Sequence, residues 1–229
     1  MAGALSGLRC RAYGARNALR KAALAGALAV AAGTAQAEVV IAALGDSLTQ
    51  GFGLPQEEGF VPVLEAWLKG RGNDVRLVNA GVSGDTTAGG LSRVAWTLTD
   101  EIDAMIVALG GNDVLRGIDP AVSRANLDGI LKTAQEAGVD VLLVGIGAPG
   151  NYGPEYRDAF EAIYPSLAEA YGALLEPNFL TPLEEARDGG APLSDLMQSD
   201  GIHPSARGVE IIVDGLGPSV EALVTRAGS

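Results

Sequence analysis

Ser47 and His203 stand in two short motifs whose residue types could support nucleophilic catalysis. Ser47 lies in "GDSLTQG" directly after an apolar run, and His203, the single histidine of the chain, lies in "DGIHP". A free serine hydroxyl is a weak nucleophile that needs an adjacent base, and an unperturbed imidazole suits that task near neutral pH. Asp200, three residues before His203, could hold the imidazole Nδ1–H and leave Nε2 free to take the serine proton. The sequence therefore contains a candidate triad.

Two further motifs contain groups that could stabilise a negative charge developing on a carbonyl oxygen. Gly84 in "GVSGDTT" could offer a backbone N–H, and Asn112 in "GGND" could offer its side-chain amide. The backbone N–H of Ser47, at the start of a helical turn, is a third candidate donor. Glycine and asparagine are also common in turns, so neither residue is specific on its own.

Ser47 has two other interpretations. A serine directly after a strand commonly caps the next helix, and a glycine-rich turn can bind a phosphate. The loop matches neither G-x-x-x-x-G-K-[ST] nor G-x-G-x-x-G and contains no lysine, which argues against a phosphate loop. It also differs from the G-x-S-x-G turn, because Thr49 occupies the position of the second glycine. Capping remains open beside nucleophilic attack.

The sequence around these motifs alternates between apolar runs and amphipathic stretches. Four of the five apolar runs are nearly continuous, as expected for strands of a sheet that is covered on both faces. Strands are predicted over residues 39–44, 75–80, 104–110, 139–147 and 173–179. Helices are predicted over residues 60–70, 90–98, 120–137, 155–171 and 205–227. This order predicts an α/β fold with a parallel sheet between layers of helices.

The unusual polar and glycine-rich motifs follow the predicted strands. The first four strands precede "GDSLTQG", "NAGVSGDTT", "LGGNDV" and "GAPGNYGPEY", and "SDGIHPSARG" precedes the last helix. Ligands of an open parallel sheet bind outside the carboxyl ends of its strands, so we expect the candidate residues to meet there. Residues 181–201 form the one long connection without clear periodicity. Such loops tend to be functional or mobile, so 181–200 is a candidate lid.

The first 37 residues resemble a secretory signal. They contain five basic and no acidic residues, an apolar run over 22–32, and an A-x-A site that ends at Ala37. This pattern predicts cleavage after Ala37 and a periplasmic or secreted protein. The alternative is a membrane anchor, but a span needs about 20 apolar residues and this run is shorter. Cys10 precedes the apolar run, where no lipid-attachment cysteine belongs.

Composition limits the partners of the remaining chain. The leader contains five of the 16 basic and none of the 28 acidic residues, so without it the net charge changes from −12 to −17. Such a charge disfavours nucleic acid and anionic lipid surfaces, and no stable membrane span is expected after signal removal. Cys10 is the single cysteine. With one histidine and no further cysteine, we expect no disulfide, no metal and no cofactor in residues 38–229.

The four motifs, taken in order, resemble the four blocks of the SGNH (GDSL) hydrolase family. The blocks are "GDSLTQG", the glycine of "SGDTT", the asparagine of "GGND", and "DGIHP". The stretches "NAGVSGDTTAGGLSR", "LGGNDVLRGI" and "NYGPEYRDAFEAIYP" are similar to the branch containing bacterial thioesterase I/lysophospholipase L1 and arylesterases. The resemblance implies a single domain over 38–229, with a flavodoxin-like three-layer α/β/α sandwich and a five-stranded parallel sheet.

The resemblance also implies roles for the candidate residues. Ser47 would be the nucleophile, His203 the base and Asp200 the orienting acid, with an oxyanion hole made by the Ser47 and Gly84 N–H groups and the Asn112 amide. The activity implied is hydrolysis of acyl esters, including lysolipids, aryl esters and thioesters, through an acyl-enzyme. Two alternatives remain: an O-acetyl esterase of cell-envelope polysaccharide, and a non-catalytic flavodoxin-like binding module.

A set of residues near the predicted strand ends should border the substrate. These are Leu48, Leu109, Gly110, Pro149, Tyr152 and Ile202. Tyr152 and Tyr156 could line an acyl groove, but ordinary loop packing explains both residues equally well or better.

Overall fold

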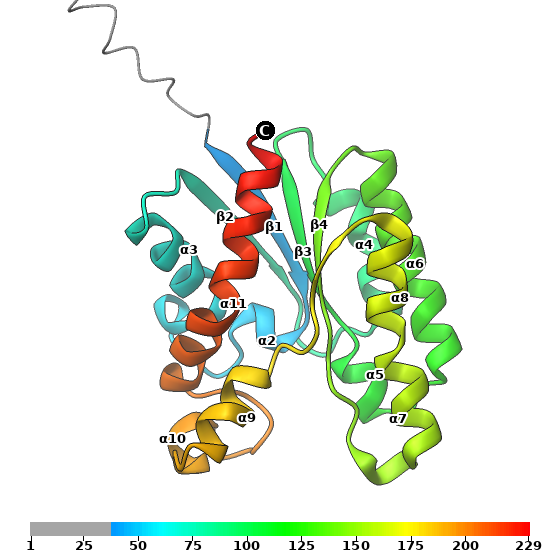
Figure 1. The fold of residues 1–229 in the computed structure, drawn as a ribbon, viewed down its shortest axis with the longest axis vertical. Coiled ribbons are helices and arrows are strands. Elements are labelled where there is room, and N and C mark those ends of the chain that lie inside the picture. Colours follow the sequence, from blue (N-terminus) through cyan, green and yellow to red (C-terminus); the bar gives the residue numbers. More distant parts are fainter. Residues whose placement is uncertain (1–37) are drawn as a thin grey trace, which may run out of the picture. The chain divides into compact units, whose positions relative to one another are not determined.

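Five parallel strands form the centre of the fold over residues 38–229, the part of the chain that the computed structural model describes (Figure 1). The strands are β1 (Val39–Gly45), β2 (Val75–Gly81), β3 (Ala104–Ala108), β4 (Asp140–Val144) and β5 (Leu174–Glu176). They pair in the order β2-β1-β3-β4-β5, the doubly wound order of flavodoxin. All five predicted strands are confirmed. The predicted signal peptide, residues 1–37, lies outside the described residues.

Helices cover both faces of this sheet. α3 (Phe60–Gly70) packs with α11 (Ala206–Ala227) on one face, and α4 (Thr87–Thr97), α6 (Pro120–Glu136) and α8 (Ile163–Tyr171) pack on the other (Figure 1). The three-layer α/β/α sandwich predicted from the sequence is therefore confirmed. Short helical segments stand at the carboxyl ends of the strands: α2 (Ser47–Gln50), η1 (Gln56–Glu58), α5 (Gly111–Leu115), η2 (Gly150–Tyr152) and α7 (Pro154–Glu161).

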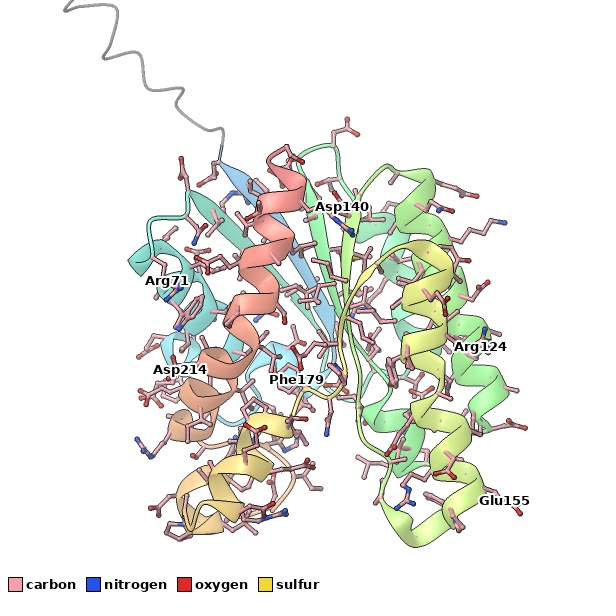
Figure 2. The ribbon with its side chains drawn as sticks, viewed as in Figure 1. Arg71, Arg124, Asp140, Glu155, Phe179 and Asp214 are labelled. Carbon is pink, nitrogen blue, oxygen red and sulfur yellow. The ribbon has the colours of Figure 1, made fainter. Side chains whose placement is uncertain are left out.

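The interior strands account for most of the apolar pattern in the sequence. Every residue of β1 and of β3 is buried, whereas the edge strand β2 has only two buried positions. Phe179, which follows β5, packs its ring 5.0 Å from that of Phe60 inside the molecule, whereas Arg124 and Glu155 are exposed on helices of the opposite layer (Figure 2). The continuous apolar runs are thus explained by burial on both faces of the sheet.

The predicted helix over residues 155–171 is interrupted. It consists of α7 and α8, which meet at Ala162. Pro165, in the first turn of α8, has no backbone N–H to donate, and its ring cannot pack against the carbonyl of Glu161 in a continuous helix. The proline therefore starts a second helix within an otherwise continuous amphipathic pattern.

The segment 181–201, predicted as a long loop, contains two helices. α9 (Thr181–Asp188) packs against α11, and α10 (Leu193–Leu196) follows it. Leu183 is the one buried residue of α9, so the sequence shows almost no helical periodicity there. The loop prediction was wrong because this helix contributes so little apolar surface to the core.

A buried carboxylate joins three helices beside the strand ends. Asp113 of α5 has no exposed surface and accepts hydrogen bonds from the Thr87 backbone N–H at 2.8 Å, from the Thr87 hydroxyl, and from the Ser123 hydroxyl at 2.9 Å. Asn126 in turn donates to the Thr87 hydroxyl at 3.0 Å. The network ties α5 to the first turns of α4 and α6 and so fixes the residue before it, Asn112.

We predict that Asp113→Ala lowers the free energy of unfolding by about 3 kcal/mol, because it leaves three buried donors without an acceptor. Urea unfolding followed by circular dichroism measures the change. Asp100→Ala, at an exposed position, is the control and should alter the unfolding free energy by less than about 0.5 kcal/mol. A loss at Asp113 as small as that of the control would mean that the network gives no net stability.

Candidate active site

The chain turns sharply after β1, and this turn determines whether the Ser47 hydroxyl caps the next helix. Asp46 is the N-cap residue of α2, and its Oδ1 accepts a hydrogen bond from the Leu48 N–H at 3.0 Å. Ser47 is the first residue of the helix rather than its cap. The capping interpretation of Ser47 is therefore wrong, and its hydroxyl is available for other contacts.

The Ser47 hydroxyl begins a chain of hydrogen bonds. His203 Nε2 lies 2.8 Å from Ser47 Oγ, and His203 Nδ1 lies 2.7 Å from Asp200 Oδ2. The other oxygen of Asp200 accepts the backbone N–H groups of His203 at 3.0 Å and Ile202 at 2.9 Å. The bonds from His203 and then from Ile202 lower the pKa of Asp200 to about 2. An ionised Asp200 holds the proton on Nδ1 and leaves Nε2 as the acceptor that faces the serine.

The loop that carries His203 is tied to the loop that follows Ser47. The Gln198 backbone N–H donates to the His203 carbonyl at 2.8 Å, and the Gln198 side chain donates to the carbonyls of Pro204 at 2.9 Å and of Phe52 at 2.7 Å. The Phe52 ring lies 4.6 Å from the imidazole ring. Ser47 and His203, which are far apart in the sequence, are therefore held together by hydrogen bonds between their two loops.

The three candidate oxyanion donors line the same cavity as His203. Ser47, Gly84, Asn112 and His203 all border a cavity of about 330 Å³ at the carboxyl ends of the strands. Gly84 has φ +84°, a conformation that favours glycine, and Arg116 donates to its carbonyl at 2.9 Å. Asn112 is the second residue of α5, and the N-cap residue of this helix, Gly110, has a φ of +125° that lets the chain turn sharply from β3 into the helix. The prediction that these residues meet at one edge of the sheet is therefore confirmed.

Arg93 holds the strand ends at this edge of the sheet in place, and the sequence did not reveal this role. Its guanidinium pairs with Asp85 at 2.7 Å and donates to the carbonyls of Ala80 at 2.6 Å and Gly45 at 2.8 Å. One side chain therefore joins the ends of β1 and β2 to the loop that contains Gly84. In the sequence it is only an arginine on a predicted amphipathic helix, because two of its three partners are backbone carbonyls, which leave no signal in residue type.

The apolar part of the cavity includes half of the predicted substrate contacts. Leu48, Pro149 and Ile202 line it, together with residues that the sequence analysis did not name: Phe52, Val114, Leu115, Ile146 and Leu180. These side chains come from the segments that follow β1, β3, β4 and β5 and from the loop before α11, so no common pattern in the sequence marks them.

The other predicted contacts lie outside the cavity lining. Leu109 is fully buried in the core, and Gly110 lies against Tyr164, whose hydroxyl donates to the Leu109 carbonyl at 3.0 Å. Tyr152 packs beside Tyr156, whose hydroxyl donates to the carbonyl of Ile118 at 2.8 Å. Both tyrosines therefore have packing roles in this structure.

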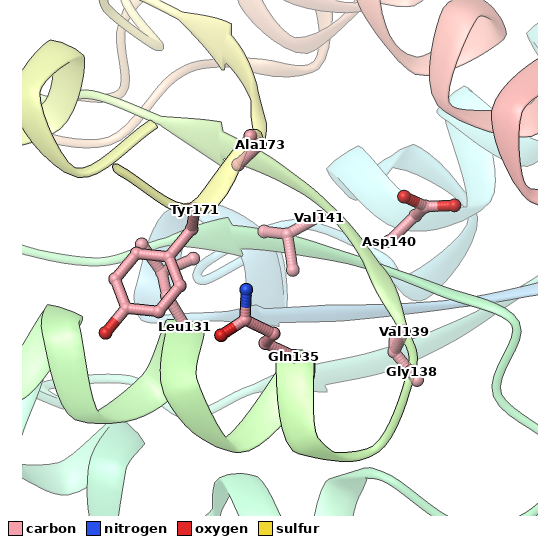
Figure 3. A pocket seen from close by; sticks show the side chains of 9 residues that line it. Leu131, Gln135, Gly138, Val139, Asp140, Val141, Tyr171 and Ala173 are labelled. Atoms are coloured by element: carbon pink, nitrogen blue, oxygen red, sulfur yellow. The ribbon is translucent and has the colours of Figure 1, made fainter. Parts of the chain in front are cut away.

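A second hollow, of about 190 Å³, lies at the opposite edge of the sheet. It is bordered by the end of α6, the start of β4 and the turn before β5, with Gln135, Val141 and Tyr171 around it (Figure 3). No serine or histidine lines it. Among residues 38–229, no group of three or more His, Cys, Asp or Glu side chains is arranged to hold a metal ion. The contact between a serine and a histidine lies at the cavity beside Ser47.

Comparison with known proteins agrees with this geometry. The model of the GDSL-like Lipase/Acylhydrolase family matches residues 43–211. "Esterase TesA" of Pseudomonas aeruginosa is 38% identical over 203 residues, which cover 88% of this chain and 98% of that protein. "Thioesterase 1/protease 1/lysophospholipase L1" of Escherichia coli K12 is 34% identical over 183 residues, covering 79% of this chain and 83% of that protein.

A solved structure gives the same result for the fold. "Crystal Structure of TesA" is 38% identical and has a TM-score of 0.72, covering 80% of this chain and 99% of that one. The site and fold therefore define an SGNH-type hydrolase. The chain belongs to the GDSL-like lipase/acylhydrolase family, whose members hydrolyse acyl esters, and the resemblance stated from the sequence is confirmed.

Asp46 gives the site a pH-dependent stability. Its side chain is 3% exposed, and burial raises its pKa from 3.8 to about 6, against the opposing effect of the Leu48 and Asn112 hydrogen bonds. Because the folded state binds this proton more tightly than the unfolded state, the stabilisation is complete below about pH 4 and is lost as the pH rises through about 6.

We predict that Asp46→Asn removes this pH dependence. Between pH 4 and pH 7, the unfolding free energy of the wild type should fall by about 2–3 kcal/mol relative to that of the variant, which corresponds to a shift of about two pKa units. Urea unfolding at both pH values measures the difference. Equal pH dependence in the two proteins would show that Asp46 titrates in the folded protein as it does in the unfolded chain.

Proposed function

We propose that this esterase is an exported serine hydrolase that cleaves acyl esters through an acyl-enzyme on Ser47. The observation that carries the proposal is the continuous chain of hydrogen bonds from Ser47 through His203 to Asp200. Ser47 and His203 lie at the wall of a largely apolar cavity. Gly84 and Asn112, on the same cavity, are the proposed oxyanion donors beside the Ser47 N–H.

In the first half-reaction, Ser47 Oγ attacks the ester carbonyl carbon while His203 Nε2 takes the hydroxyl proton. The carbonyl oxygen becomes an oxyanion that accepts hydrogen bonds from the Ser47 and Gly84 N–H groups and the Asn112 amide. Asp200 stabilises the imidazolium that forms. As the tetrahedral intermediate collapses, the bond to the leaving alcohol breaks, and His203 gives its proton to that oxygen.

In the second half-reaction, a water molecule replaces the alcohol. His203 takes a proton from the water as its oxygen attacks the acyl carbon, and the same donors hold the second oxyanion. Collapse returns the proton to Ser47 Oγ and releases the carboxylic acid. The enzyme ends in its starting state, so no cofactor or metal is needed for the proposed cycle.

The cavity supports substrates with short or medium acyl chains. Its volume of about 330 Å³ is at the lower end of the range of small-molecule pockets, and most of its side chains are apolar. Exposed Phe52, Leu115 and Ile202 extend the apolar surface at its mouth, which supports lysolipid substrates with part of the chain outside. The net charge of residues 38–229 disfavours strongly anionic substrates.

A second candidate, deacetylation of cell-envelope polysaccharide, uses the same catalytic groups. An acetyl group would leave most of the apolar cavity empty, so the lining favours longer acyl chains. A chain-length series of p-nitrophenyl esters separates the two functions, since a maximum at acetate would favour the polysaccharide substrate. The binding-module alternative is excluded by membership in a hydrolase family.

Export is proposed from the sequence of residues 1–37. The basic start, the apolar run and the A-x-A site at Ala37 support a cleaved signal and a periplasmic or secreted enzyme. Within residues 38–229, no helix has both the length and the apolar character needed to cross a membrane.

The test of the nucleophile is intact-mass analysis after treatment with a fluorophosphonate. One adduct should form on the wild type and none on Ser47→Ala, because only a serine activated by a base reacts. Ser83 lines the same cavity, but its hydroxyl donates to Gln50 at 2.9 Å instead of contacting a base. Ser83→Ala is therefore a matched control that should still take one adduct. An adduct that survives in Ser47→Ala would reject Ser47 as the nucleophile.

The position of Phe52 predicts a preference among leaving groups. The leaving alcohol must lie beside His203, which protonates it, and Phe52 is the aromatic side chain on that side of the cavity. An aromatic pair contributes about 0.5–1.5 kcal/mol beyond area burial. We therefore predict that Phe52→Ala lowers kcat/KM for phenyl butyrate about fivefold more than for ethyl butyrate.

Phe52→Tyr, which keeps the ring, should retain the wild-type ratio of the two kcat/KM values. Steady-state hydrolysis of both esters by the three proteins measures this. Equal losses on the aryl and alkyl esters in Phe52→Ala would mean that the ring supports His203 and does not contact the leaving group.

A further inference from the structure

The Asn112 side chain has two orientations of nearly the same shape. Rotation by 180° about its last bond exchanges the amide nitrogen, which donates hydrogen bonds, with the amide oxygen, which only accepts them. An oxyanion is stabilised by the N–H end and repelled by the carbonyl end. A donor at this position is therefore useful only if something in the protein fixes which end faces the cavity.

The side chain beside the Asn112 amide is the Asp46 carboxylate. Asn112 Nδ2 donates to Asp46 Oδ2 at 3.3 Å, while Asp46 Oδ1 accepts the Leu48 N–H at 3.0 Å. An ionised carboxylate offers acceptors only, so it attracts the nitrogen end of the amide and repels the oxygen end. The amide nitrogen has two hydrogens, and the contact with Asp46 uses one, which leaves the second for a ligand in the cavity that Asn112 lines.

The surroundings leave this carboxylate little freedom to move. A Cβ at Gly111 would lie 3.1 Å from Asp46 Oδ2, so the first residue of α5 is in close contact with the acid. Asp46 is 3% exposed. The titratable groups that act on it electrostatically are His203, Asp113 and the phenol of Tyr164. Of these, only His203 can become cationic, so no permanent positive charge compensates for the burial of Asp46.

Capping α2 does not by itself explain a buried acid at this position. Serine, threonine and asparagine cap helices about as well as aspartate and leave no charge to be desolvated. Burial of the Asp46 carboxyl opposes its ionisation and so costs stability near neutral pH. The property that distinguishes a carboxylate from the neutral caps is that it has acceptors on both of its oxygens, one for Leu48 and one for Asn112.

We propose that Asp46 is a positioning residue that fixes the Asn112 amide with an N–H, rather than its carbonyl oxygen, directed at the oxyanion. The inference rests on the proposed function, in which Asn112 is an oxyanion donor. Asp46 borders the cavity with 3% of its surface exposed. Its proposed action is on the Asn112 amide, rather than on the substrate or on the proton that His203 moves.

The decisive variant is Asp46→Asn, which keeps the shape of the side chain and an oxygen to cap α2. Its amide nitrogen then faces Asn112 and attracts the Asn112 carbonyl, which turns an acceptor toward the oxyanion. At pH 8, kcat for p-nitrophenyl butyrate should fall at least about 10²-fold, as when an oxyanion donor is removed. KM should stay within about twofold, since the lost contact belongs to the transition state.

Two comparisons separate positioning from a general structural effect. Asp103→Asn makes the same chemical change at an aspartate that accepts the Val40 backbone N–H at 2.8 Å, at the other end of β1. Its kcat should stay within about twofold of the wild type. Circular dichroism and thermal melting of each variant show that it is folded.

A double-mutant cycle with Asn112→Ala completes the test. Without the Asn112 amide there is nothing to orient, so adding Asp46→Asn to Asn112→Ala should change kcat less than about threefold. Losses that simply multiply would overturn the inference, because Asp46 would then act independently of Asn112. A wild-type kcat in Asp46→Asn would overturn it as well.

The cycle also distinguishes this inference from the proposed function. If Asn112→Ala keeps the wild-type kcat, the oxyanion assignment itself is wrong and the role of Asp46 is rejected with it. If Asn112→Ala loses activity and Asp46→Asn does not, only the positioning role is rejected. The fluorophosphonate result at Ser47 is independent of both outcomes.

Discussion

The pairing of three parallel strands is the constraint on which the site depends. β1 lies between β2 and β3, and their carboxyl ends are level, since Gly45 is paired with Gly81 on one side and with Ala108 on the other. The segment that follows each of these strands contains one proposed oxyanion donor: Ser47 after β1, Gly84 after β2 and Asn112 after β3. A slip of one pairing would move a donor by the length of a residue, about 3.3 Å, which exceeds the tolerance of a hydrogen bond.

Polar contacts around the strand ends fix the positions of the segments that follow the three strands. Arg93 ties the carbonyl ends of β1 and β2 to the Gly84 loop through Asp85, and buried Asp113 ties α5 to α4 and α6. These contacts replace hydrophobic packing where the chain must expose backbone N–H groups to a ligand. The apolar core holds the strands, and the polar network holds the loops that leave them.

The sequence was sufficient for the strands because each interior strand is buried on both faces and reads as an unbroken apolar run. It was also sufficient to place the triad and oxyanion candidates at one edge, because parallel strands bring their carboxyl ends together. It failed where tertiary contacts decide, since α9 has one buried leucine and Arg93 donates to backbone carbonyls. The break before Pro165 is a local effect of the proline, which the continuous amphipathic pattern around it concealed. Leu109 was placed at the cavity by its position after β3, but the chain enters α5 with this side chain turned into the core.

Two aspartates at one site have opposite environments, and the difference suits the separate tasks proposed for them. Asp200 is partly exposed, yet three hydrogen bonds from its own loop lower its pKa to about 2, so it stays charged throughout the range in which a histidine can act as a base. Asp46 is buried and has a pKa of about 6, which makes its charge conditional on pH. A carboxylate that stabilises an imidazolium must always be ionised, and Asp200 achieves this through local hydrogen bonds rather than burial. A carboxylate that orients an amide needs a rigid, buried position instead, and a raised pKa is the physical consequence of that burial.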